Sequence, residues 1–80
     1  SVPLAEVEQA ARSAAEAAGL TVALTVDEPG GIAFDASGAT SAALFGWLAS
    51  LKTEYGVENR DLTVIENADA TLDASGSLGG

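Results

Sequence analysis

The stretch FDASGA at residues 34–39 returns almost unchanged as LDASGS at residues 72–77. A second pair of segments, AAGLTV at 17–22 and EYGVEN at 54–59, recurs at nearly the same separation. The offset is 38 residues for DASG and 37 for the glycines of the second pair, so nearly the whole chain is two copies of one unit. We expect each copy of DASG to close the last strand of its unit.

The first unit begins with an amphipathic helix. Apolar residues at 3–18 fall on one side at helical spacing, and Gly19 follows where a left-handed cap belongs. LTVALTV at 20–26 alternates between apolar and small polar side chains, which is typical of a half-buried strand. Pro29-Gly30 then predicts the centre of a type II turn. A second strand follows, with an apolar side formed by Ile32, Phe34 and Ala36.

The second unit repeats this order. Residues 41–55 predict a helix with Gly56 at its C-terminal cap, and the apolar stripe of this helix consists of Leu44, Leu48, Leu51 and Tyr55. The next segment predicts a strand that directs Leu62 and Val64 to the helices. After a turn near 67–69, we expect a last strand in which one side is formed by Ala70, Leu72 and Ala74.

Two αββ units pack most economically as one four-stranded antiparallel sheet with both helices on one face. We therefore expect a single α+β domain, 1–80, built from repeats at about 1–37 and 38–80. This αββαββ arrangement is a circularly permuted ferredoxin-like sandwich, entered at a helix. The open face of its sheet is expected to be mildly apolar and to carry Thr21, Ala23, Thr25, Ala33, Asp35, Thr63, Ile65, Thr71 and Asp73.

The composition argues against several classes of function. Three basic residues against twelve acidic ones, a net charge of −9, provide no basic cluster for nucleic acid or anionic lipid. The chain has no cysteine and no histidine, which excludes thiol nucleophiles, imidazole catalysis and the usual zinc and haem sites. It contains neither a leader nor an apolar run of about 18 residues, so we expect a soluble piece of a longer protein.

Asp35 and Asp73 raise the question of a catalytic carboxylate pair. Aspartic proteases use Asp-Thr/Ser-Gly, whereas here an alanine follows each aspartate, and 80 residues hardly build the deep cleft that such a pair needs. Asp27-Glu28 lies in an expected hairpin tip without an EF-hand pattern, and the glycine pairs lack phosphate-binding spacing. We therefore expect no catalytic residue, no metal site and no cofactor.

Five residues are candidates for contact with another protein. Trp47 lies at the edge of the apolar stripe of the second helix, where a large aromatic side chain can anchor a partner or pack at the rim of the core. The same two alternatives hold for Phe45 on the opposite flank. On the open face of the sheet the candidates are Thr63, Ile65 and Thr71.

The run ALFGWLASLKTEYGVENRDLTVIEN at 43–67, followed by ATLDASGSL at 70–78, resembles the periplasmic C-terminal domain of type II secretion system M proteins. In that family a Leu-Leu-x-Trp-Leu helix leads through a glycine into a strand, a short turn and a final alternating strand. The first helix and strand, VEQAARSAAEAAGLTV at 7–22, are also similar, whereas Ser41 stands where a bulky apolar residue is often expected. The matching positions are Leu44, Phe45, Trp47, Leu48, Leu51, Gly56, Val57, Leu62, Val64, Leu72, Ala74 and Leu78.

The resemblance implies a bacterial inner-membrane protein whose cytoplasmic tail, membrane span and coiled segment lie outside this chain, with the present domain in the periplasm. It also implies a non-enzymatic role in protein secretion: forming a weak homodimer and binding the periplasmic domain of the L protein in the assembly platform. The L protein and pilus-assembly relatives share this permuted fold. An alternative from another class is a small ligand-binding regulatory domain, a role that fold alone does not distinguish.

Overall fold

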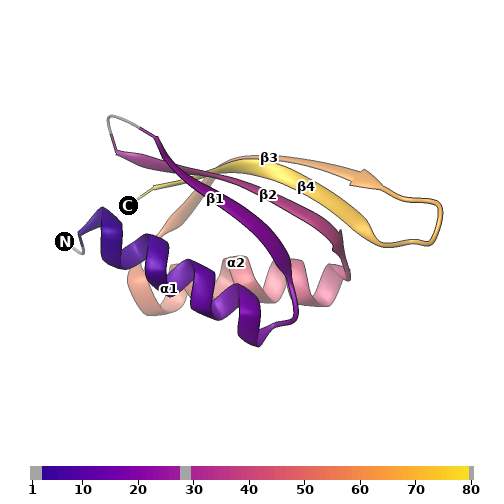
Figure 1. Cartoon of the computed structure of the whole chain (residues 1–80), viewed down its shortest axis with the longest axis horizontal. Helices are drawn as coiled ribbons and strands as arrows, with labels where there is room; N and C mark the ends of the chain where they lie inside the picture. Colours follow the sequence, from indigo (N-terminus) through magenta and orange to yellow (C-terminus); the bar gives the residue numbers. More distant parts are fainter. Residues whose placement is uncertain (1–2, 28–29, 80) are drawn as a thin grey trace.

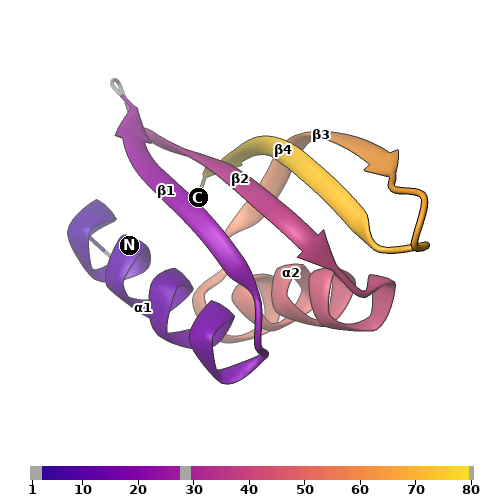
Figure 2. The same ribbon diagram turned by 45° about the vertical axis from the view of Figure 1, so that its right-hand side comes forward.

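The computed structural model describes residues 3–27 and 30–79. The elements are, in order, α1 (Leu4–Ala17), β1 (Thr21–Asp27), β2 (Gly31–Ala39), α2 (Ser41–Tyr55), β3 (Glu58–Glu66) and β4 (Leu72–Gly79). The strands form one antiparallel sheet in the order β1-β2-β4-β3, and both helices pack against the same face of it (Figure 1, Figure 2). The predicted α+β fold and its αββαββ order are confirmed. The predicted turn at Pro29-Gly30 falls partly outside the described residues.

The ends of α2 show why the chain folds as the sequence predicts. At the start, the Thr40 hydroxyl accepts a hydrogen bond of 3.1 Å from the N–H of Ala43, which satisfies one of the free donors of the first turn. At the other end, Gly56 adopts a left-handed φ of 67°, as predicted from its position after the stripe. The N–H groups of Gly56 and Val57 then donate back to carbonyls of the last turn, so the chain leaves the helix directly into β3.

The core lies between the helices and the two central strands. Its largest fully buried side chains are Ile32, Phe34, Leu44, Leu51 and Leu78. Alanines of α1 complete the layer, with Ala11 and Ala15 buried against the sheet. The apolar side of each predicted strand in the first unit therefore faces the helices, as its alternation indicates.

The two DASG segments pair with each other at the centre of the sheet. Ala36 of β2 is the direct partner of Ala74 of β4, which is its own equivalent in the second unit, and Asp35 is the partner of Ser75. A residue and its equivalent can face each other in this way only on an internal two-fold axis. The repeated DASG segment is therefore the part of each unit that pairs with the other unit at the centre of the sheet.

Two predictions about the second unit are wrong. DASG opens β4 instead of closing it, since this strand continues to Gly79. Ala70 precedes the strand, in a turn with a φ of 70°, instead of alternating within it. The β3–β4 hairpin extends beyond the N-terminal end of α2 (Figure 1). Val64 pairs with buried Ala74 and so lies on the helix side of the sheet as predicted, but it is 39% exposed there.

Candidate interaction surfaces

Trp47 is a core residue. Its side chain is 2% exposed and packs edge-on against Phe34, with ring centroids 5.4 Å apart and an interplanar angle of 77°. Its indole N–H donates a hydrogen bond of 3.0 Å to the Ala11 carbonyl of α1, so the ring ties the two helices together. Of the two roles considered for Trp47, the structure therefore places it in the core, and it offers no surface to a partner in this conformation.

Phe45 lies on the opposite flank of α2 and is 48% exposed. It belongs to an exposed strip along the outer side of the helix that also contains Ala42, Gly46 and Ala49. The spacing of these residues places them side by side over two turns. No charged residue occurs in α2 before Lys52. A helix that is apolar on its outer side as well as its inner side is typical of one that packs against a second surface.

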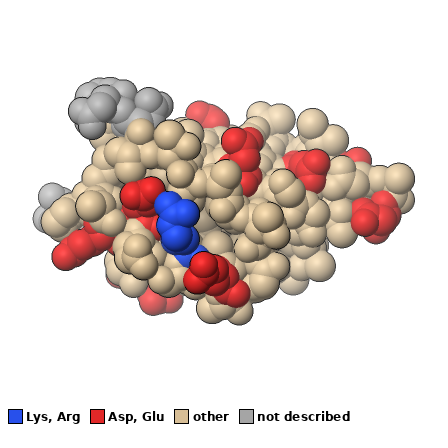
Figure 3. All heavy atoms as spheres, in the orientation of Figure 1, with Lys and Arg blue, Asp and Glu red and all other residues tan. Residues whose placement is uncertain are grey.

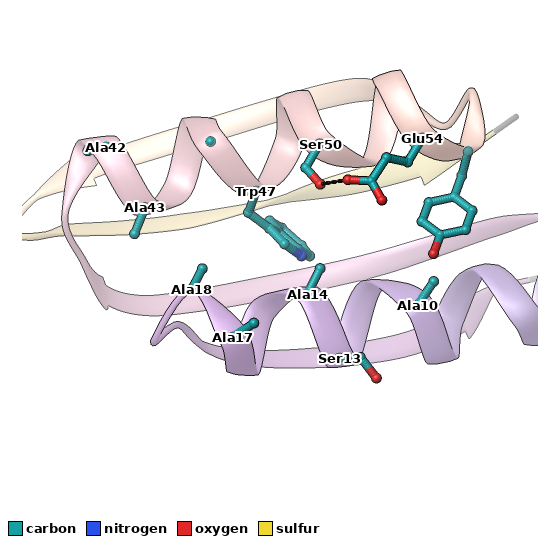
Figure 4. Close-up of a pocket in the computed structure, with 12 residues that line it drawn as sticks. Ala10, Ser13, Ala14, Ala17, Ala18, Ala42, Ala43, Trp47, Ser50 and Glu54 are labelled. Atoms are coloured by element: carbon teal, nitrogen blue, oxygen red, sulfur yellow. Dashed lines mark hydrogen bonds between the residues drawn. The ribbon is translucent and has the colours of Figure 1, made fainter.

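A groove of about 710 Å³ separates the two helices (Figure 4). Small side chains line it from both sides, including Ala10, Ala14 and Ala17 of α1 and Ala43 and Gly46 of α2. Trp47 projects from α2 toward α1 across this space (Figure 4). Two of the polar groups near its end are bonded to each other, since the Ser50 hydroxyl donates to the Glu54 carboxylate at 2.9 Å. The groove exists because alanine and glycine are too small to fill the gap.

The open face of the sheet carries a shallow hollow of about 230 Å³ near the internal two-fold axis. Its lining includes Asp35, Ser37, Asp73 and Ser75 from the central strands and Thr63 and Ile65 from β3. Ile65 is 62% exposed, the highest fraction among the large apolar side chains that the structure describes. The face is therefore mixed in character, with one large apolar side chain beside two carboxylates.

Thr71 belongs to the β3–β4 hairpin turn and precedes the strand. Its N–H and hydroxyl both donate to one carboxylate oxygen of Asp69, at 3.0 and 2.6 Å, and these bonds hold the pKa of Asp69 below its ordinary value of 3.8. Asn67 donates to both Thr71 and Asp73. The bond from Asn67, together with one from the Gly38 N–H, likewise lowers the pKa of Asp73. The hydroxyl of Thr71 is thus engaged in bracing the hairpin.

Over the residues that the structure describes, charge is spread without a basic patch. Acidic atoms are scattered over the face in Figure 3, and basic side chains contribute one small group to it. Arg12 forms an ion pair of 2.9 Å with Glu8 on α1, and Lys52 one of 3.7 Å with Glu58. Both pairs are substantially exposed, so each contributes little to stability. Uncharged surface lies between these scattered charges (Figure 3) and is available for protein contacts.

Within the described ranges, the polar groups do not converge into a recognisable reaction centre. Ser50 and Ser77 each donate to a carboxylate, but the chain has no histidine to act as the base of a serine nucleophile. No group of three acidic residues in the described part of the chain is placed to hold a metal ion. The carboxylates of Asp69 and Asp73 accept hydrogen bonds from their own hairpin and from β2.

Sequence reasoning missed the apolar strip on α2, although a signal was present. The first eleven residues of the helix carry no charge, which is unusual for a helix that covers only one face of a sheet. Neither helix in the described part of the chain has the length and apolar character needed to span a membrane. A scan against protein-family models finds no match to this chain, and a search of curated proteins finds no similar one.

Proposed function

We propose that this domain is a non-enzymatic interaction module, and that it serves as the periplasmic domain of an M-type protein in the inner-membrane assembly platform of a type II secretion system. In this role it self-associates weakly and binds the periplasmic domain of the L protein. The family assignment rests on the resemblance of the sequence, and the αββαββ fold agrees with it.

The observation that carries the proposal is the apolar strip on the outer side of α2. Phe45 is half exposed among small side chains, with no charged residue on the helix until Lys52. Aromatic side chains that insert into a partner commonly dominate the binding energy of an interface. A strip of this kind on a chain with a net charge of −9 is more consistent with a binding surface than with a solvated one.

The test is a set of amide chemical-shift maps of the domain, recorded over a dilution series and then with the periplasmic domain of the L protein. We expect shifts to cluster along α2 around Phe45 when the L domain is added. Phe45→Lys should weaken that complex about tenfold or more, as loss of an aromatic anchor does. Thr53→Lys is the matched control, because it adds the same charge at an exposed site two turns further along. If no amide moves in either experiment, the proposed function is wrong.

The groove between the helices favours a second candidate, a small-molecule regulatory domain. Its volume of about 710 Å³ falls within the range of about 300–1,000 Å³ found for ligand sites. Against this, its described lining offers few polar groups, and Ser50 and Glu54 are bound to each other. Screening amino acids and other small metabolites by the same shift maps separates the two candidates, since a ligand in the groove would perturb Trp47 and the alanines of α1.

A further inference from the structure

The two edges of the sheet differ in how they are protected against pairing. Edge strand β3 is interrupted by a register shift between Asn59 and Asp61, and charged residues occur along it at Glu58, Arg60, Asp61 and Glu66. Charges and irregular register are the usual features that prevent an edge from pairing with another chain. Edge strand β1 is less protected: all seven residues pair with β2 in continuous register, and its one charged residue, Asp27, lies at its end. No described strand pairs with the outer side of β1.

The charge pattern favours self-association at β1 over the other edge of the sheet, because β1 has one charged residue and β3 has four. Two chains with a net charge of −9 repel each other, so self-association is favoured at a surface with few charges. Successive residues of a helix are about 100° apart, so Arg12 lies on the flank of α1 opposite the groove-lining Ala10. Arg12 is paired there with Glu8 at 2.9 Å. The helix flank on the β1 side therefore carries this ion pair and Glu16, one net negative charge, beside a strand whose one charged residue is Asp27.

The strand is also suited to pair with itself. Leu24 lies at the middle of Thr21–Asp27, so antiparallel pairing about Leu24 would use the whole strand in both copies. Opposite residues of an antiparallel pair point to the same face, which would set Val22 against Val26 of the second copy on the helix side. Val26 is 41% exposed in the single chain, and Val22 and Leu24 are only partly buried. Pairing would cover this row of apolar side chains.

We infer that β1 is the self-association edge of the domain, and that a second copy of this chain pairs with it antiparallel about Leu24 to form a continuous eight-stranded sheet. The inference rests on the proposed function and adds the place and geometry of the homodimer. A seven-residue strand is about 23 Å long and buries much less than the roughly 800 Å² per partner of a stable interface. The dimer is therefore weak and concentration-dependent.

Charge-pattern variants of β1 test both the surface and the register. Ala23 and Thr25 are exposed on the open face, so their replacement should preserve the fold, which circular dichroism checks. In the inferred register, Ala23 of one copy faces Thr25 of the other. The variant Ala23→Lys/Thr25→Lys places two pairs of like charges opposite each other, and should raise the dimer dissociation constant about tenfold or more. Ala23→Lys/Thr25→Glu places opposite charges there instead, and should dimerise at least as well as the unmodified chain.

The matched control is Thr53→Lys/Ala68→Lys, which adds the same two charges at exposed positions on α2 and in the β3–β4 turn. It should leave dimerisation unchanged. Sedimentation equilibrium from about 10 μM to about 1 mM covers the range in which such a weak dimer dissociates. The double-lysine variant of β1 lowers the net negative charge, so a loss of dimer in this variant cannot come from overall repulsion.

The outcomes separate this inference from the proposed function. If the unmodified chain dimerises and the β1 double-lysine variant dimerises equally well, self-association stands but β1 is not its surface. If the lysine–glutamate variant fails to dimerise while the unmodified chain dimerises, pairing about Leu24 is wrong. If the chain stays monomeric to about 1 mM and the amides of β1 shift only with the L domain, the edge binds a foreign strand and the second copy is excluded.

Discussion

Two glycine-to-alanine substitutions should change the stability of this domain in opposite directions. Gly76 lies in β4 beside β3, and a Cβ atom at this position would collide with the backbone carbonyl oxygen of Asp61. Gly46 lies within α2, and a Cβ atom there would meet no atom within 4 Å. The added methyl group therefore meets the backbone of β3 at position 76 and open space at position 46.

The magnitudes follow from these surroundings. Inserting a methyl group into a packed site costs about 1–3 kcal/mol, and Gly76→Ala belongs toward the upper end because the obstacle is backbone that cannot rotate away. In a domain of this size, 1 kcal/mol shifts Tm by about 4–8 °C, so we expect Tm to fall by roughly 10–20 °C. Gly46→Ala should raise the free energy of unfolding by about 0.4–1 kcal/mol, because alanine restricts the unfolded chain and favours the helix.

The assay is urea unfolding of the three proteins, followed by circular dichroism and by the fluorescence of the single tryptophan. Coincident transitions would establish that the free energies can be compared. A Gly76→Ala protein within about 0.5 kcal/mol of the unmodified chain, the scatter of ordinary surface substitutions, would refute the close approach of β3 to β4. A destabilised Gly46→Ala protein would refute the open space at that position.

Three further results are expected, each measurable by urea unfolding followed by circular dichroism. Trp47→Phe should lower the free energy of unfolding by about 1–3 kcal/mol, since it removes the bond to the Ala11 carbonyl and leaves a cavity beside it; a neutral result would contradict the bridging role. Thr40→Ala should cost about 1 kcal/mol through loss of the helix cap, whereas Thr40→Ser should restore most of it. The pKa of Asp73 is below 3.8 in the folded chain, chiefly because its carboxylate accepts a hydrogen bond from Asn67. The ionised carboxylate therefore stabilises the fold above about pH 4, and this stabilisation is lost as the pH falls through the lowered pKa. Asp73→Asn should therefore flatten the dependence of stability on pH below about 4, and an unchanged slope would contradict the assignment.

Much of the fold could be predicted from sequence because local signals agreed with one another. Helical spacing over 41–55, a capping glycine and strand alternation each fixed an element within one or two residues. The start of β4 was missed because Ala70 continues the alternation of Leu72 and Ala74, although hydrogen bonds from Thr71 to Asp69 fold this residue into the turn. The alternation of apolar residues does not show that side-chain hydrogen bonds will hold a residue in the turn instead of the strand.

The candidate surfaces were harder to predict, because exposure depends on what lies across the core. Phe45 and Trp47 flank the same stripe and have similar sequence surroundings, yet one is half exposed and the other buried. The difference comes from α1, whose alanines leave space for the indole ring and whose Ala11 carbonyl accepts its N–H. Nothing in the second helix alone distinguishes the two aromatic residues.

The two units are alike where they meet and different where they face outward. The DASG segments pair at the internal axis, but the equivalent edge strands diverge: β1 carries one charged residue, Asp27, and β3 carries four. The helices diverge in the opposite sense, since α1 exposes Glu6, Arg12 and Glu16, and α2 exposes Phe45 among small residues. Each unit thus has one apolar outer surface, an edge in the first and a helix face in the second. Such a division suits a domain that binds a second copy and a different partner at once. If the two surfaces are independent, Phe45→Lys should weaken binding of the L domain by the same factor whether or not β1 carries the two lysines.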